Sequence, residues 1–127
     1  MKLRIKFNNK KVDAELNNTE TAKKIYARLP LKGQANLWGE EIYFKIPVNE
    51  ELEKENSKQN MAIGDLAYWP EGNAFCIFFG KTPASINHEP RAISMVTLIG
   101  KIKGDAKLFK DVKEGNLIIL EKNPENN

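Results

Sequence analysis

The stretch from Gly64 to Gly80 constrains the fold of this chain more than any other part of the sequence. Two aromatic-rich runs lie on either side of a turn at Glu71-Gly72-Asn73, a pattern typical of a β-hairpin. The second run is apolar at every position from Ala74 to Phe79, as in a strand that is buried on both faces. This hairpin predicts a β-rich core around which the other elements are arranged.

Composition places the chain among ordinary globular proteins. Its 127 residues suit a single domain, and 41% hydrophobic with 29% charged residues is a typical balance. No apolar run approaches the roughly 18–20 residues of a membrane span, and the first residues do not resemble a signal peptide. A single cysteine cannot form an internal disulfide, so a cytoplasmic location is expected. With one histidine, we expect no metal site and no cofactor.

A net charge of +3 raises the question of nucleic-acid binding. Lys2, Arg4 and Lys6 alternate with apolar residues, so they share the outer face of a half-buried strand. The next strand carries Asp13 and Glu15 on its outer face, and pairing of the two strands would place opposite charges side by side. We therefore expect a self-neutralising solvated face, and neither a nucleic-acid nor a membrane partner.

Alternation and turn signals predict about eight short strands. They are expected at residues 2–7, 11–16, 31–38 and 40–46, in the two limbs of the hairpin, and at 94–103 and 117–120. In the fourth strand, Ile42, Phe44 and Ile46 share one face, whereas Glu41, Tyr43 and Lys45 share the other. The predicted fold is mainly β, a closed or nearly closed antiparallel barrel with two helices.

The remaining segments are predicted as helices, loops or ends. Apolar spacing from Ala22 to Leu29 predicts an amphipathic helix, capped by Asn18 or Thr19 and ended by Pro30. A second, short helix is expected after Gly104-Asp105. The polar segment 48–60 is interpreted as a solvated loop or flap, and 121–127 as a frayed tail of a single domain spanning 1–127.

Several motifs resemble those of the cyclophilins, and more closely those of a family of small prokaryotic cyclophilin-like proteins of unassigned function. They are Trp38-Gly-Glu-Glu-Ile-Tyr-Phe, Gly64-Asp-Leu-Ala-Tyr-Trp-Pro, Phe78-Phe-Gly-Lys-Thr-Pro83 and Ile99-Gly-Lys-Ile102. The resemblance covers nearly the whole chain. It implies a cyclophilin-type barrel with one amphipathic and one short helix, and an outer groove on the barrel wall.

The same resemblance bears on catalysis. Cyclophilins that isomerise proline bonds use an arginine, a glutamine and a histidine, and the matching positions here hold Phe44 or Lys45, Ala74, and about Val96. Lys45 is a weak substitute, because an ammonium group lacks the fork of a guanidinium. No catalytic residue is therefore predicted.

The resemblance also implies which side chains face the groove. Along the hairpin's second limb, Phe75, Ile77 and Phe79 would fill the barrel, and Ala74, Cys76 and Phe78 would face outward. The predicted ligand-binding groove consists of Phe44, Lys45, Trp69, Cys76, Phe78 and Met95. The alternative is that these side chains are simply covered by the 48–60 flap or by a partner subunit.

Other chemistry-bearing residues are assigned structural roles. Cys76 is expected to be a buried hydrophobic residue rather than a nucleophile. His88 and Arg91 form a candidate secondary polar cluster in a loop. Trp38 and Tyr43 could line one barrel end beside Glu41, but core filling by their aromatic rings is the preferred expectation.

Three functions follow, in this order. The first is a non-catalytic or weakly active domain that binds a proline-containing peptide or small ligand in an apolar groove. The second is a peptidyl-prolyl cis-trans isomerase of low activity. The third is a structural protein whose apolar patch is an oligomer interface, so the chain is expected to be a monomer or homodimer.

Overall fold

Ten strands and one α-helix make up the fold in the computed structural model, which describes residues 1–124. The strands are β1 (Lys2–Phe7), β2 (Lys10–Leu16), β3 (Leu31–Gln34), β4 (Asn36–Leu37), β5 (Glu41–Lys45), β6 (Ser57–Asn60), β7 (Asp65–Trp69), β8 (Ala74–Phe78), β9 (Arg91–Ile102) and β10 (Leu117–Lys122). The helix is α1 (Glu20–Arg28), and three short 3-10 helices are η1 (Lys54–Asn56), η2 (Pro70–Gly72) and η3 (Ala106–Asp111).

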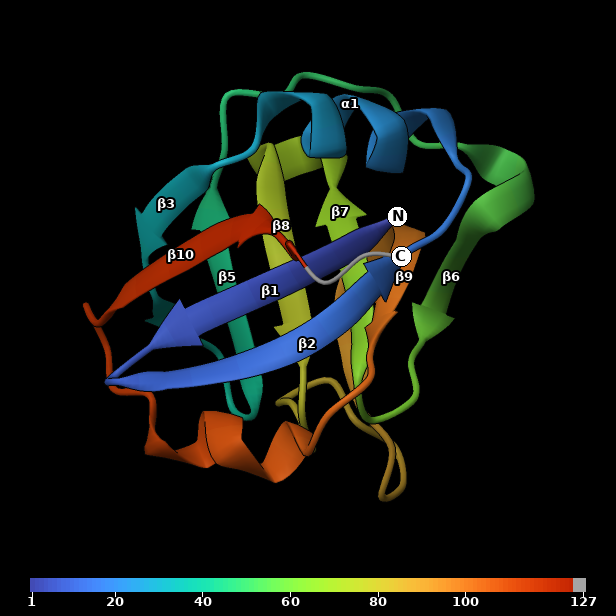
Figure 1. The fold of residues 1–127 in the computed structure, drawn as a ribbon. Helices are drawn as coiled ribbons and strands as arrows, with labels where there is room; N and C mark the ends of the chain where they lie inside the picture. The colour runs from blue at the N-terminus through green and yellow to red at the C-terminus, as the bar shows by residue number, and fades with distance from the viewer. Residues whose placement is uncertain (125–127) are drawn as a thin grey trace.

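All ten strands belong to one antiparallel sheet. Nine of them follow the order β3-β10-β1-β2-β9-β7-β8-β5-β4, and β6 lies off this path and pairs with β9. The sheet curls so that β1, β2 and β10 face β5, β7 and β8 across the core, while α1 lies over one end and η3 over the other (Figure 1). Its end strands β3 and β4 do not pair with each other, so the barrel is nearly closed. The prediction of a mainly β, closed or nearly closed antiparallel barrel is confirmed as a barrel that is not fully closed, with ten strands instead of about eight.

One extra strand arises because the predicted strand 31–38 is interrupted at Ala35. The first part, β3, pairs with β10, and the second part, β4, pairs with β5. At the break, the Ala35 amide donates to the Asn116 carbonyl oxygen at 2.8 Å. The chain therefore changes partner at this point, which no local pattern in the sequence indicates.

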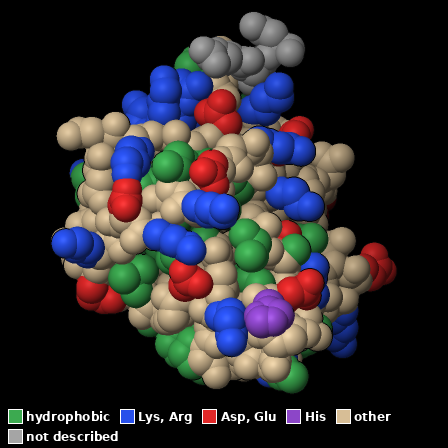
Figure 2. Space-filling model, turned by 90° about the horizontal axis from the view of Figure 1, so that it is seen from below, with side chains coloured by type: hydrophobic (Ala, Val, Ile, Leu, Met, Phe, Trp, Pro, Cys, Tyr) green, Lys and Arg blue, Asp and Glu red, His purple; other side chains and the backbone are tan. Residues whose placement is uncertain are grey.

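The first hairpin has the register that its charges predict. Lys2 lies opposite Glu15, and Arg4 lies opposite Asp13 with its Nε 3.1 Å from the Asp13 Oδ1. Positive and negative side chains are also interspersed over the end of the molecule seen from below (Figure 2). Opposite charges thus neutralise each other locally on these surfaces.

Helix α1 begins and ends where the sequence indicates. Thr19 is the N-cap, and its side-chain oxygen accepts from the Ala22 amide at 3.1 Å. Ala22 and Ile25 are fully buried against the barrel end, and Pro30 follows the last turn. The helix therefore plugs one end of the barrel.

The segment 48–60 is more tightly attached than its polar composition suggests. Residues 57–60 form β6, which pairs with the first half of β9. The Glu53 carboxylate accepts hydrogen bonds from the backbone and side chain of Thr21, at 2.8 and 2.6 Å, and the Glu53 amide donates to Thr97 Oγ1 at 3.1 Å. The predicted solvated flap is therefore anchored to both α1 and β9.

The central hairpin separates two buried clusters, as the alternation predicts. Phe75, Ile77 and Phe79 belong to the large cluster inside the barrel. Ala74, Cys76 and Phe78 belong to a smaller cluster on the other face of the sheet, where Met61 also lies. All three are at most 2% exposed, so the predicted outer groove is largely filled by neighbouring side chains.

The C-terminal strand extends further than expected. Strand β10 continues to Lys122, and the Asn123 amide donates to the Lys2 carbonyl oxygen at 3.1 Å. The predicted frayed tail therefore does not begin at Glu121; its last three positions, 125–127, lie outside the described residues.

Within residues 1–124, no helix combines the length and the apolar character that crossing a lipid bilayer would require.

Candidate functional site

A small pocket opens at the edge of the outer cluster, between β5 and the start of β9. Its volume is about 90 Å³. The lining residues come from four places along the chain: Trp38, Glu41, Tyr43, Trp69, Ala92, Ile93 and Val96. Most of these side chains are apolar, with one carboxyl group among them, a composition that is common in ligand sites.

A tight turn at Gly39 positions two of the lining residues. The Trp38 amide donates to the Glu41 carbonyl oxygen at 2.9 Å, and the Glu41 amide donates back to the Trp38 carbonyl oxygen at 3.2 Å. Gly39 has a φ of +61°, and a Cβ there would lie only 2.8 Å from the Lys81 carbonyl oxygen. Glycine at this position therefore brings Trp38 and Glu41 to the same pocket.

The aromatic walls of the pocket are held in fixed orientations. The Tyr43 and Trp69 rings meet edge to face, with centroids 6.3 Å apart and planes at 83°. The Trp69 Nε1 donates to Ser94 Oγ at 2.9 Å, and Ser94 Oγ donates to the Glu71 carboxylate at 3.1 Å. This chain of hydrogen bonds fixes the indole ring at the end of β7.

Glu41 is the ionisable acid of the pocket. It is 7% exposed, and burial raises its pKa to about 7, while a hydrogen bond from the Cys76 thiol partly opposes the rise. Among the residues that the structure describes, no lysine, arginine or histidine forms an ion pair with it. Near neutral pH the carboxyl group is therefore present in both protonation states, and it can exchange a proton or face a positive charge.

Cys76 lies beneath the pocket and is chemically protected. It is 1% exposed, and its pKa is raised well above the usual value by burial and by the neighbouring Glu41. The Cys76 Sγ also lies 3.8 Å from the Ala74 carbonyl oxygen. A thiol has only one hydrogen to donate, and a carboxylate is a stronger acceptor than a carbonyl oxygen, so we assign that hydrogen to Glu41. A protonated, buried thiol is not a nucleophile.

The structure brings together part of the predicted groove. Trp69 lines the pocket, and Cys76 and Phe78 lie in the cluster beneath it. Lys45 is exposed and Met95 is 42% exposed, and neither lines the pocket.

Phe44 does not belong to the groove. It lies inside the barrel, 1% exposed, and its ring stacks on that of Phe75 with centroids 5.6 Å apart. Because side chains alternate along β5, Phe44 shares the inner face with Ile42, and Tyr43 takes the outer position. The resemblance-based placement of Phe44 is therefore wrong.

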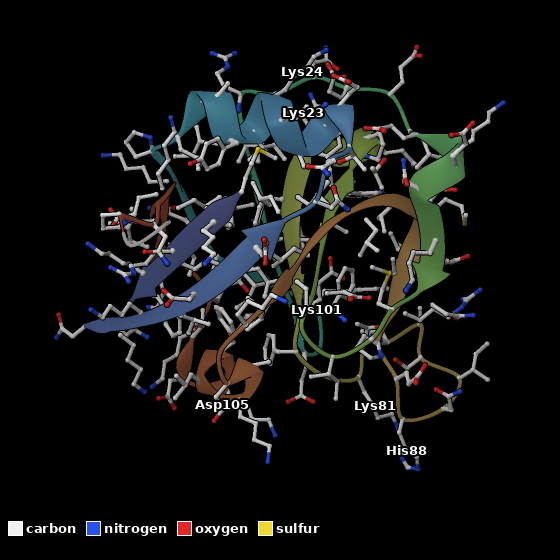
Figure 3. All side chains as sticks on the ribbon, turned by 45° about the vertical axis from the view of Figure 1, so that its right-hand side comes forward. Lys23, Lys24, Lys81, His88, Lys101 and Asp105 are labelled. Carbon is white, nitrogen blue, oxygen red and sulfur yellow. The ribbon has the colours of Figure 1, made fainter. Side chains whose placement is uncertain are left out.

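His88 and Arg91 do not form a polar cluster. His88 is exposed at the tip of the loop before β9 and points away from the molecule (Figure 3). Arg91 donates through Nε to Asn60 Oδ1 at 3.2 Å, and in the described part of the chain no hydrogen bond or ion pair joins the two residues. Residues 1–124 also contain no group of three or more His, Cys, Asp or Glu placed to hold a metal ion.

From the sequence, core filling was the preferred role for Trp38 and Tyr43, lining of a barrel end beside Glu41 was the lesser alternative, and Glu41 was not predicted as a site residue. One signal for their role was present, because Glu41 and Tyr43 are two positions apart on a strand and so share a face, directly after a turn carrying Trp38. The apolar wall formed by Ala92 and Ile93 had no such signal. It depends on the sheet order, which separates β9 from β5 by two strands, β7 and β8.

The comparisons with known proteins agree with this architecture. The family model described as Cyclophilin-like matches residues 1–121. The solution structure of the hypothetical protein AF2241 from Archaeoglobus fulgidus is similar to this chain, with a TM-score of 0.80 and 41% sequence identity over 97% of this chain and 95% of that one. No curated protein matches the chain.

Proposed function

The chain belongs to the cyclophilin-like family, and on that premise we propose that it is a binding module that holds a small ligand, or one residue of a proline-containing peptide, in the pocket of Trp38, Tyr43, Trp69 and Glu41. The observation that best supports this proposal is that three aromatic side chains and a buried acid line the same small opening. Apolar walls supply affinity, and a single polar group supplies orientation.

The size of the pocket limits what enters it. A cavity of roughly 150 Å³ is enough to hold benzene, and this one measures about 90 Å³. It therefore admits one compact group, while the rest of a ligand extends over the surface. Ile93, which is 59% exposed at the pocket wall, offers an apolar surface for that extension.

A weak prolyl isomerase is the alternative function. The usual polarisation of a proline nitrogen needs a positive charge, and among the described residues that line the pocket there is no lysine or arginine. Lys45 lies on the outer face of β5 but outside the lining, whereas a protonated Glu41 could donate a hydrogen bond instead. A coupled assay of proline isomerisation tests this alternative. An isomerisation rate at high protein concentration that equals the rate in buffer alone excludes catalysis.

The binding proposal is tested by NMR titration of the folded protein with proline-containing peptides and a panel of small metabolites. We expect shifts at the two indole N–H signals and along β5, and loss of those shifts in Trp38→Leu. Ile86→Ala is the matched control, because Ile86 is 81% exposed and lies outside the pocket lining. Unchanged spectra at millimolar ligand would contradict the proposal.

The third alternative, an oligomer interface, is tested with the same samples. Ile63, Ile93 and Met95 are apolar and 57%, 59% and 42% exposed. A concentration-dependent increase in mass by light scattering, abolished by Ile93→Ser, would support an interface. A protein that stays monomeric at millimolar concentration would exclude the oligomer interface.

A further inference from the structure

Among residues 1–124, Glu41 differs from the other buried acid, Asp65, in lacking a positive partner. Asp65 has a side chain only 3% exposed, but its carboxylate lies 3.4 Å from the Lys58 Nζ and accepts a hydrogen bond from the Ala62 amide at 2.8 Å. Glu41 has the weak thiol donor of Cys76 and, within residues 1–124, no ion pair. A charge buried without a partner costs stability, and a cation from outside the chain would find an unpaired carboxylate here.

The side chains around Glu41 are those that attract cations. Trp38, Tyr43 and Trp69 all line the same pocket as the carboxyl group. The faces of aromatic rings carry negative potential, and cations bind over them, most strongly over tryptophan. Because the Tyr43 and Trp69 planes stand at 83°, they form two adjacent walls of a box rather than a flat stack.

We propose that this pocket binds the methylated ammonium group of a cationic ligand, with the Glu41 carboxylate facing the charge and the three rings surrounding the methyl groups. The inference rests on the proposed function, that the pocket is a ligand site, and adds the charge and chemical class of the ligand.

The polarity of the lining favours a methylated ammonium over a primary ammonium or a guanidinium. Those groups carry three and five N–H donors, each of which needs an acceptor once it leaves water. The pocket offers the single carboxyl group of Glu41, and its remaining wall consists of Ala92, Ile93 and Val96. A fully methylated ammonium has no N–H donor, so the apolar wall imposes no such cost.

A ligand pair that differs only in charge tests the inference on the unaltered protein. Choline and its uncharged analogue 3,3-dimethyl-1-butanol have the same shape, and each is titrated while the indole N–H signals are followed at constant ionic strength. We expect choline to bind at least about tenfold more tightly. Equal or tighter binding of the alcohol would overturn the inference and leave the proposed function standing, because an apolar ligand would then occupy the pocket.

A pair of charge-matched variants locates the effect. Glu41→Gln is expected to reduce the preference for choline over the alcohol about tenfold. Glu40→Gln removes the same charge from the neighbouring residue, which does not line the pocket, and is expected to bind both compounds as the parent does. Equal losses in the two variants would contradict a direct role for Glu41.

A comparison of peptides distinguishes a protein partner from a small molecule as the source of the methylated ammonium group. A peptide carrying trimethyllysine is compared with the same peptide carrying unmodified lysine. Tighter binding of the modified peptide than of choline would assign the pocket to a protein partner, and the reverse would assign it to a small molecule. If neither choline nor the modified peptide shifts any signal at tens of millimolar, the inference is wrong, and the peptide and metabolite panel above decides the proposed function separately.

Discussion

Tyr43 on β5 and Trp69 on β7 meet edge to face above the strand that separates them, with ring centroids 6.3 Å apart. Beneath them, β8 contributes Cys76 opposite Tyr43 and Ala74 opposite Trp69. These side chains are small, so the two rings can lean toward each other over the sheet. The wall of the pocket thus depends on the small size of Cys76 and Ala74, although β8 itself does not line the pocket.

Replacing Glu41 should change how stability depends on pH. Its pKa is about 7 in the folded protein and about 4.5 in the unfolded chain, so the folded state holds this proton more tightly. The stability that it contributes is therefore fully present below the unfolded pKa and is lost as pH rises from 4.5 to 7. Between pH 5 and pH 8 the loss should be roughly 2–3 kcal/mol.

Urea unfolding of the parent and of Glu41→Gln at both pH values measures this effect. On going from pH 5 to pH 8, the free energy of unfolding of the variant should rise by roughly 2–3 kcal/mol relative to that of the parent, since glutamine does not titrate. Glu40→Gln serves as the control and should follow the parent. Parallel pH profiles for the parent and Glu41→Gln would show that the buried carboxyl group has an ordinary pKa.

Cys76 should be unreactive in the folded protein. Its thiol is 1% exposed and its pKa is raised by burial and by Glu41, so little thiolate is present and little of it is accessible. We expect no reaction with a disulfide reagent in native buffer over an hour, and one equivalent of reaction in denaturant. Rapid stoichiometric labelling of the native protein would contradict this placement.

Glu53 should stabilise the junction between α1 and the 48–60 segment. Burial acts to raise its pKa, but hydrogen bonds from Thr21 and Asn56 outweigh burial and lower the pKa overall. Glu53→Ala should cost about 1.5–3 kcal/mol at pH 7, because hydrogen bonds to a charged acceptor are lost. The contribution is present above the unfolded pKa of the carboxyl group and disappears as pH falls through the folded pKa.

Chemical denaturation at pH 7 and pH 3 checks the role of Glu53. Glu51→Ala is the matched control, since Glu51 is exposed and close by, and it should remain within about 0.5 kcal/mol of the parent. A Glu53→Ala protein as stable as Glu51→Ala would mean that this anchor contributes nothing.

The two indole N–H groups should differ in exchange with solvent. The Trp69 Nε1 donates to Ser94, so its hydrogen should exchange more slowly than that of Trp38. Ser94→Ala should accelerate exchange at Trp69 and leave Trp38 unchanged. NMR spectra of Trp38→Phe assign the two signals, and equal exchange rates in the parent would contradict the hydrogen bond.

The elements that could be predicted depend on local patterns. Helix α1 followed from a cap, an apolar stripe and a proline within a dozen residues, and the hairpin of β7 and β8 followed from its turn. Alternation also grouped Phe44 with Ile42 correctly, and the error came from preferring the resemblance to cyclophilins at that position. The split at Ala35 and the pairing of β6 with β9 were missed, because both are choices of a distant partner.

The sequence by itself determined which face of each strand a side chain occupies, because successive side chains point to opposite sides. Alternation thereby separated Phe75 and Ile77 from Cys76 and Phe78, and the resemblance to cyclophilins indicated which of the two pairs lies inside the barrel. Only the tertiary structure decided which outward residues form a site. The pocket exists because the sheet order places residues of β9, such as Ile93, at the same opening as Glu41 of β5. The burial that raises the Glu41 pKa is a property of that packing and not of any local segment.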